Sequence, residues 1–175
     1  RAVLDEAARA KRRGEAGGAA ADGRTKAGAR AAEPPRVLLY AAVGAEAPTR
    51  SLAEQLMAAG VQVCLPRLKK GRPGEMEIAP VSGWDALVPG PFFDIPQPAD
   101  DAPAVAPERL AMVIVPGVGF ARAGRRLGNG GGYYDRFLPR LPRRTPRVGW
   151  AFFLQVVERL PEEPHDCRVD IVVTE

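Results

Sequence analysis

The sequence predicts an α/β domain of three layers, α/β/α, with helices on both faces of a mostly parallel β-sheet. Two observations predict this class. Short apolar runs bounded by glycine or proline recur along the chain, as is typical of buried parallel strands. The first two runs, 36–43 and 61–65, enclose a helical pattern at 50–59, and a strand–helix–strand unit of this kind pairs its strands in parallel.

The other elements complete the same pattern. Residues 1–13 and 19–32 are rich in alanine and predict two helices that end at Pro34 and Pro35. Residues 76–81 predict a short strand, and the proline-rich segment 89–107 predicts an ordered coil on the surface or a flexible lid. We expect the remaining elements in this order: a strand at 111–115, a helix at 133–141, a strand at 148–152, a short helix at 154–159 and a last strand at 170–173.

Length and composition indicate one globular domain. A chain of 175 residues with 46% hydrophobic residues can bury a core of its own, and we expect 1–175 to be a single domain whose natural start lies upstream of Arg1. No apolar run is long enough for a membrane span and no signal peptide is visible. We therefore expect a cytoplasmic protein, a monomer without membrane contact, in which Cys64 and Cys167 are free thiols.

The distribution of charge indicates one local basic segment. The net charge is +4, but residues 36–175 are nearly balanced, which disfavours a nucleic-acid-binding surface. Residues 122–147 instead hold eight arginines and a single acidic residue, Asp135. We expect this segment to attract a polyanion, although its part at 136–147 also fits a solvated helix face.

The loop that follows the 111–115 strand carries the strongest chemical signal. It is rich in glycine, and glycines without a Cβ let backbone N–H groups turn toward an anion before the helix at 133–141 begins. Arg125 and Arg126 can add bidentate contacts, and Asp135 can hold a Mg²⁺ that bridges phosphate oxygens. The alternative is a flexible surface loop, since the run matches neither the P-loop nor the dinucleotide-binding pattern.

The motif itself resolves this choice. The run RLGNGGGYYDRFL at 126–138, preceded by VPGVGF at 115–120, closely resembles the signature of the 5-formyltetrahydrofolate cyclo-ligase family, also called methenyltetrahydrofolate synthetase. Other segments resemble family motifs in the same order: EAPT at 46–49, CLPR at 64–67, IPQP at 95–98, and LPEEPHDCRVD with VTE at 160–175. The resemblance therefore covers almost the whole chain.

The resemblance implies a reaction and a fold. ATP and 5-formyltetrahydrofolate, a folate that can carry a polyglutamate tail, would give ADP, phosphate and 5,10-methenyltetrahydrofolate with Mg²⁺. Phosphorylation makes the formyl oxygen a good leaving group, and N10 then closes the ring, so positioning and charge neutralisation suffice without a protein nucleophile. The implied fold is Rossmann-like, of the NagB/RpiA/CoA-transferase-like type.

The resemblance also implies roles for particular residues. ATP would contact Arg1, Arg126, Leu127, Gly128, Asn129, Gly130, Gly131, Gly132, Tyr133 and Tyr134. The folate would contact Ala41, Glu46, Asn129, Gly130, Gly131, Gly132 and Tyr133, with Glu46 at the pteridine or formyl group. Asp135 and Asp166 would hold Mg²⁺. Plainer alternatives stay open: Glu46 as a solvated loop acid, Asp166 as the cap of a turn, and one of the two tyrosines as a packed ring.

Four positions depart from the family pattern. Ala111 and Ala121 stand where the family carries Asp, Asn129 stands where it often has an aromatic or basic residue, and Arg1 matches only the second cation of its Lys-x-x-x-Arg motif. Ala121 and the missing lysine of that motif motivate one alternative, a folate- or nucleotide-binding protein without turnover. A nucleic-acid binder that uses 122–147 is a further alternative, which lacks any recognised motif.

Overall fold

The computed structural model describes residue 5 and residues 33–69, 71–161 and 163–174. The helices predicted at 1–13 and 19–32, and the ATP contact predicted at Arg1, lie outside the described residues, residue 5 apart. Within the described part of the chain, no helix is both long and apolar enough to cross a membrane.

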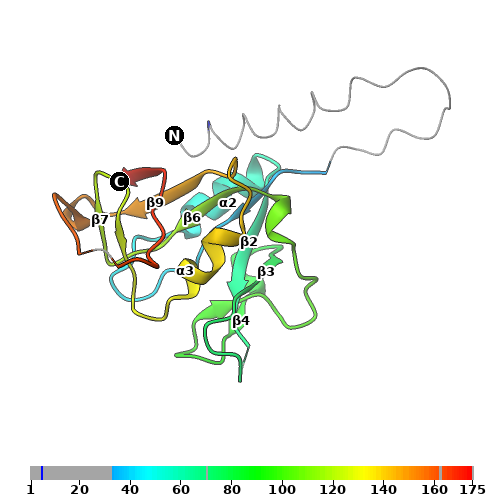
Figure 1. The fold of residues 1–175 in the computed structure, drawn as a ribbon. Helices are drawn as coiled ribbons and strands as arrows, with labels where there is room; N and C mark the ends of the chain where they lie inside the picture. The colour runs from blue at the N-terminus through cyan, green and yellow to red at the C-terminus, as the bar shows by residue number, and fades with distance from the viewer. Residues whose placement is uncertain (1–4, 6–32, 70, 162, 175) are drawn as a thin grey trace, which may run out of the picture.

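The described chain folds around one six-stranded sheet (Figure 1). In spatial order its strands are β11 (Ile171–Thr174), β9 (Arg147–Ala151), β6 (Leu110–Val115), β1 (Arg36–Leu38), β2 (Gln62–Arg67) and β3 (Glu77–Pro80). Every neighbouring pair is parallel except β2 and β3, which are antiparallel. The prediction of an α/β domain with a mostly parallel sheet is therefore confirmed.

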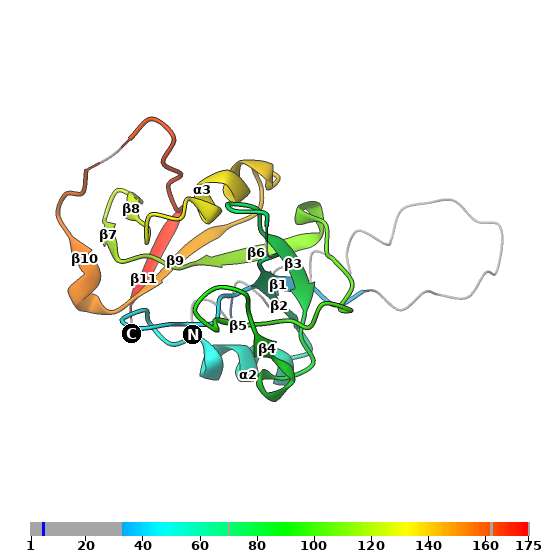
Figure 2. The ribbon, with the colours of Figure 1, turned by 90° about the horizontal axis from the view of Figure 1, so that it is seen from below.

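Alternation along the central strands builds two cores. Val37 of β1 and Val63 of β2 face one cluster of buried side chains, whereas Leu38 and Cys64 face the other, because successive residues of a strand point to opposite faces. Helix α2 (Arg50–Ala58) covers the first face with Leu52, Ala53 and Leu56. Helix α3 (Tyr133–Phe137) covers the second with Tyr134 and Phe137. Figure 2 shows the two helices on opposite sides of the sheet.

Two small sheets flank the large one. Strands β4 (Val88–Pro89) and β5 (Pro96–Gln97) form a hairpin within the proline-rich segment, which is thus more regular than the predicted coil or lid. Strands β7 (Gly119–Ala121), β8 (Arg126–Leu127) and β10 (Val156–Val157) form the other sheet.

Three element predictions need correction. The strand predicted at 36–43 ends at Leu38. Leu39 N still donates to Cys64 O of β2 at 2.9 Å, but from Tyr40 onward the chain bonds to its own loop: the Tyr40 hydroxyl donates to Ala47 O at 2.8 Å, and the Thr49 hydroxyl donates to Tyr40 O. Thr49 consequently gives α2 no side-chain cap. The helix predicted at 133–141 is α-helical only to Phe137 and continues as a 3₁₀ turn, Leu138–Arg140, because Pro139 has no N–H to donate.

The third correction concerns the short helix predicted at 154–159. The structure has a 3₁₀ turn at Phe153–Gln155, and the next two residues form β10, which pairs in parallel with β7. The pairing with a strand distant in the sequence overrides the local helical pattern.

Candidate functional site

A cavity of about 520 Å³ lies where the chain leaves β1 and β6. Its lining comes from 40–46 after β1, 66–68 at the end of β2, Met76 before β3, 90–97 in the β4–β5 hairpin, 116–117 after β6, and 126–135 in the glycine-rich loop and the start of α3. Its lining is mainly apolar and aromatic. The site therefore occupies the carboxyl-terminal edge of the sheet, where ligands bind in open α/β folds.

Two glycines shape the glycine-rich loop. A Cβ on Gly128 would come within 2.6 Å of Arg126 Nη1, so a side chain there would displace the guanidinium group. Gly132 precedes α3 with φ at 62°, in the left-handed region that favours glycine. Helix α3 spans only five residues, so its dipole adds little to anion binding, contrary to our expectation for a longer helix.

Arg126 and Asp135 form a buried ion pair beside this loop. Arg126 Nη2 donates to Asp135 Oδ1 at 2.6 Å, and the two side chains are 4% and 17% exposed. The backbone N–H of Cys167 donates to the same oxygen at 3.2 Å. Burial alone would raise the pKa of Asp135, but the hydrogen bond and the charge of Arg126 outweigh it and lower this pKa. Asp135 is thus an ionised carboxylate at the wall of the cavity.

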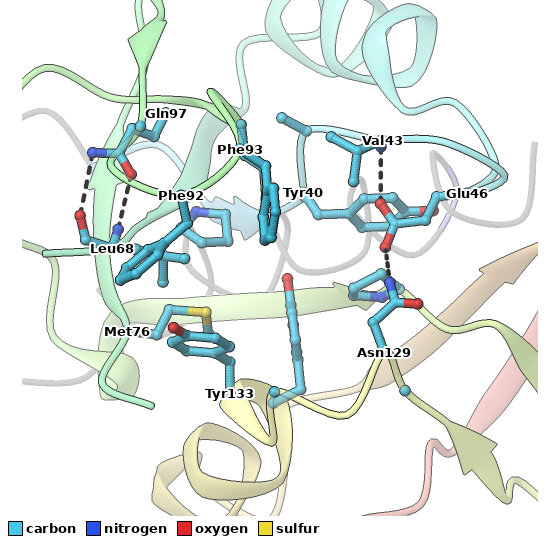
Figure 3. A pocket seen from close by; sticks show the side chains of 18 of the residues that line it. Tyr40, Val43, Glu46, Leu68, Met76, Phe92, Phe93, Gln97, Asn129 and Tyr133 are labelled. Carbon is cyan, nitrogen blue, oxygen red and sulfur yellow. Dashed lines mark hydrogen bonds between the residues drawn. The ribbon is translucent and has the colours of Figure 1, made fainter. Parts of the chain in front are cut away.

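Glu46 meets the glycine-rich loop from the other side of the cavity, as Figure 3 shows. Its Oε1 accepts a hydrogen bond from Asn129 Nδ2 at 3.2 Å, although the two residues are 83 positions apart. Its Oε2 accepts a bond from Val43 N at 3.0 Å. Burial raises the pKa of Glu46, partly offset by the Val43 bond. Each carboxylate oxygen can accept a second bond, so the pair still offers acceptors to a ligand.

The hairpin β4–β5 supplies aromatic residues that sequence reasoning missed. Phe92 and Phe93 form its tip and line the cavity, and Figure 3 shows Phe93 extending toward the space beside Tyr40. The Phe93 residue is 97% exposed. Phe93 and Asp94 both have φ at 52°, a conformation that costs energy for residues other than glycine. The nearby IPQP motif was the one signal that pointed to this segment.

Gln97 fastens this hairpin to the end of β2. Its side-chain oxygen accepts a bond from Leu68 N at 3.0 Å, and its side-chain nitrogen donates to Leu68 O at 3.3 Å (Figure 3). Gln97 is buried, and its side-chain amide makes the same pair of hydrogen bonds with the Leu68 backbone that a neighbouring strand would make. The hairpin tip therefore has a fixed base.

The structure brings most of the predicted site residues to one cavity. Those that line it are Ala41, Glu46, Arg126, Gly128, Asn129, Gly131, Gly132, Tyr133, Tyr134 and Asp135. Leu127 and Gly130 belong to the same loop but are not part of the lining. The departures Ala111 and Ala121 lie in β6 and β7, and neither lines the cavity.

Asp166 lies apart from this lining and has another partner. Its Oδ2 accepts a bond from Glu163 N at 2.8 Å, which is the turn-capping arrangement that the sequence left open. No group of three or more His, Cys, Asp or Glu side chains that could hold a metal occurs within 33–69, 71–161 or 163–174. A Mg²⁺ needs only one or two carboxylates when phosphate oxygens and water complete its shell, so Asp135 alone fits an ion that shares a nucleotide's phosphates.

Comparisons with known proteins agree on one family. The family model described as the 5-formyltetrahydrofolate cyclo-ligase family matches residues 3–175. The 5-formyltetrahydrofolate cyclo-ligase of Escherichia coli strain K12 is 37% identical over 140 residues, which span 79% of this chain and 76% of that protein. The enzyme of the same name from Mycolicibacterium smegmatis is 28% identical over 143 residues, with 79% and 72% covered.

Two solved structures share the fold. The 5,10-methenyltetrahydrofolate synthetase of Aquifex aeolicus superposes with a TM-score of 0.66 at 33% identity and covers 81% of this chain and 69% of its own. The 5,10-methenyltetrahydrofolate synthetase of Mycoplasma pneumoniae has a TM-score of 0.60 at 23% identity, with 79% and 72% covered, and supports the fold alone.

Proposed function

The chain belongs to the 5-formyltetrahydrofolate cyclo-ligase family and is an enzyme that converts 5-formyltetrahydrofolate to 5,10-methenyltetrahydrofolate, and we propose that it drives this conversion with ATP and Mg²⁺ in the cavity described above. The observation that supports this proposal best is the contact between Glu46 and Asn129. It joins the loop after β1 to the glycine-rich loop at one cavity, so two substrates can meet there.

We propose a reaction in two steps. The formyl oxygen attacks the γ-phosphorus of ATP, and ADP departs. N10 then attacks the formyl carbon and loses its proton, and phosphate leaves with the former formyl oxygen. Both steps depend on positioning and on neutralised charge.

The side chains of the site suit a reaction without a protein nucleophile. Burial raises the pKa of Cys64 to about 12 and also raises the pKa of Cys167, so both thiols stay protonated near neutral pH. His165 is mostly exposed, and neither it nor the two cysteines line the cavity. The cavity instead offers glycine backbone, an arginine, two carboxylates and aromatic rings.

ATP would lie along the loop 126–134. The glycines of this loop have no side chains, so its backbone can approach phosphates, and Arg126 is held rigidly by Asp135. Asp135 would hold Mg²⁺, with Asp166 as a second, weaker candidate. When bound, Mg²⁺ neutralises charge on the phosphate oxygens.

The folate would occupy the aromatic part of the cavity. Glu46 and Asn129 stand at one end of it, and Phe92, Phe93 and Tyr133 line it (Figure 3). A pteridine has N–H donors along one edge, which a carboxylate accepts, and flat faces, which aromatic rings cover. Ala41, a small buried residue beside Glu46, leaves room for the ring.

The fold and compartment extend this proposal. The sheet with α2 and α3 on opposite faces supports a Rossmann-like arrangement of three layers within one domain. Cys64 and Cys167 are free thiols, which supports a reducing compartment such as the cytoplasm.

One assay tests the function. The purified protein is mixed with ATP, Mg²⁺ and 5-formyltetrahydrofolate, and the near-ultraviolet absorbance band of the methenyl product is followed. We expect the band to grow only when all three are present. Binding of the folate without growth of this band would favour the alternative, a binding protein without turnover.

Replacement of Phe93 by alanine is expected to raise the KM for the folate about fivefold, because the variant loses a ring that covers the pteridine. The melting temperature should stay unchanged, since the ring is exposed in the free protein. Steady-state kinetics and a thermal melt provide both readouts. Ile171→Ala, which removes an exposed apolar side chain from the edge strand β11, is the control and should change neither the folate KM nor the melting temperature. A wild-type folate KM in Phe93→Ala would remove the ring from the site.

Acidification is expected to weaken folate binding at a higher pH than an ordinary glutamate would explain. The raised pKa of Glu46 means that a proton occupies its carboxylate as the pH falls toward this pKa, and the carboxylate then loses acceptors. The same raised pKa means that the folded state binds this proton more readily than the unfolded state, so protonation of Glu46 itself favours folding.

The measurement is the dissociation constant of the folate from about pH 8 to about pH 5, in the wild type and in Glu46→Gln. The wild type should lose affinity as the pH falls, and to a greater extent than the variant, because only the wild type carries the carboxylate with the raised pKa. Parallel curves for the two proteins would assign the pH dependence to the ligand or to another residue.

A further inference from the structure

One buried hydroxyl group at the cavity has no partner in the protein. The Tyr134 residue is 9% exposed, lines the cavity, and its hydroxyl makes no hydrogen bond to any described residue. It is the only buried hydroxyl in this condition among 33–69, 71–161 and 163–174; the other unpaired buried side-chain atoms there are the Nε atoms of Arg67 and Arg126. An unpaired buried polar group costs stability, so a folded protein that keeps one is a candidate for pairing with a ligand.

None of the polar side chains that line the cavity with Tyr134 bonds to this hydroxyl, and most of them bond to other groups. The Tyr40 hydroxyl donates to Ala47 O, and the Glu46 carboxylate accepts from Val43 and Asn129. The Arg126 guanidinium group lies against the Tyr134 ring, with its Cζ 5.9 Å from the ring centroid, and pairs with Asp135. Burial raises the pKa of the Tyr134 phenol, and the neighbouring Tyr40 and Glu46 raise it further. Tyr134 therefore keeps a neutral, buried hydroxyl that is able to donate, and the charge of Glu46 acts on it.

We propose that the Tyr134 hydroxyl donates a hydrogen bond to the 4-carbonyl oxygen of the folate's pteridine ring. This inference rests on the proposed function. The 4-carbonyl oxygen is an acceptor, and the ring N–H beside it and the amino group beyond are donors. A carboxylate accepts from the two donors, and a neutral hydroxyl beside the carboxylate donates to the oxygen. Glu46 and the Tyr134 hydroxyl together would then recognise a 4-oxo pteridine, and this hydroxyl would set the specificity for the folate while the loop 126–134 contacts ATP through its other groups.

Tyr134→Phe tests the proposal by removing only the hydroxyl. We expect the dissociation constant of 5-formyltetrahydrofolate, measured by calorimetry without ATP, to rise about tenfold. The melting temperature of the free protein should stay the same or rise, because the variant no longer buries an unpaired group. In turnover assays the KM for ATP should stay unchanged. A purely structural hydroxyl would give the reverse, a lower melting temperature with unchanged affinity.

Tyr40→Phe is the matched control for stability. It removes a hydroxyl from the same cavity, but one that donates to Ala47 O, so its melting temperature should fall. A second ligand tests whether the 4-carbonyl oxygen is the atom that accepts the bond from Tyr134. A folate analogue with a 4-amino group should bind the wild type more weakly than the 4-oxo compound, and this preference should shrink in Tyr134→Phe.

Each outcome decides a different point. Failure of the wild type to bind the folate overturns the proposed function, and this inference with it. Equal folate affinity of the wild type and Tyr134→Phe, or a fall in the variant's melting temperature, overturns the inference alone. Weaker binding with an unchanged 4-oxo preference overturns the assignment to the 4-carbonyl, and a raised KM for ATP alone assigns the hydroxyl to the nucleotide.

Discussion

Replacement of Asp135 by asparagine is expected to lower turnover about a hundredfold or more. Asparagine keeps the size of the side chain and an oxygen that can accept from Arg126 and Cys167. It loses the negative charge that would hold Mg²⁺ at the phosphates. The loss should therefore appear mainly in kcat, and the Mg²⁺ concentration for half-maximal turnover should increase.

The ion pair changes what Asp135→Asn should do to stability. The sequence alone suggests only a metal-binding role for Asp135, and that role by itself would leave the stability of the variant almost unchanged. In the structure Asp135 neutralises the buried Arg126, and we now expect the variant to lose about 1–3 kcal/mol of unfolding free energy. A thermal melt beside the kinetic assay separates the two effects.

Glu77→Gln is the matched control for this loss. Glu77 pairs at 3.0 Å with Arg67, another arginine that is almost fully buried, and neither residue belongs to the proposed site. The control should lower the melting temperature and leave turnover close to the wild-type value. Turnover of Asp135→Asn that matches the wild type at saturating Mg²⁺ would leave Asp135 only its structural partner. Asp166→Asn should lower turnover less, since its carboxylate caps the turn at Glu163.

Features set by short-range pattern could be predicted from the sequence. The strands near 62–67 and 110–115 are apolar runs between breakers, and burial on both faces of the sheet is the reason for that pattern. The position of Glu46 also followed from pattern. It lies a few residues beyond β1, and the carboxyl ends of parallel strands share one edge with the glycine-rich loop.

Features that depend on tertiary partners could not be predicted in this way. The Arg126–Asp135 pair was hidden because both residues lie in one basic, glycine-rich segment that suggested exposed contacts with an anion. The strand β10 follows an apolar stretch that also fits a helix, and only its pairing with β7 decides between them. The aromatic tip at Phe92 and Phe93 lies among prolines, which obscure periodicity. The two residues with left-handed backbone there are Phe93 and Asp94, so no glycine marks the turn in the sequence.

Glutamine in place of Glu46 is expected to raise the KM for the folate tenfold or more, with little change in the KM for ATP. A charged acceptor that bonds ring N–H groups contributes about 1.5–3 kcal/mol, which corresponds to about tenfold to a hundredfold in affinity. Glutamine keeps the length of the side chain and one acceptor, so the bond from Asn129 Nδ2 can persist. Its new NH₂ group cannot accept from Val43 N, which donates to Oε2 in the wild type, so a small loss of stability should accompany the change.

The split between the two Michaelis constants carries the argument, because loss of stability alone would not favour one substrate. Glu54→Gln makes the same chemical change on the exposed face of α2, where Glu54 pairs with Arg50, and should alter neither constant. If the ATP constant rises in Glu46→Gln and the folate constant does not, then Glu46 serves the nucleotide and the aromatic part of the cavity must hold something else. If neither constant moves, the carboxylate only fastens the loop after β1 to Asn129. A rise in the folate constant alone places the pteridine beside Glu46, in the cavity that the aromatic hairpin tip and the glycine-rich loop also line.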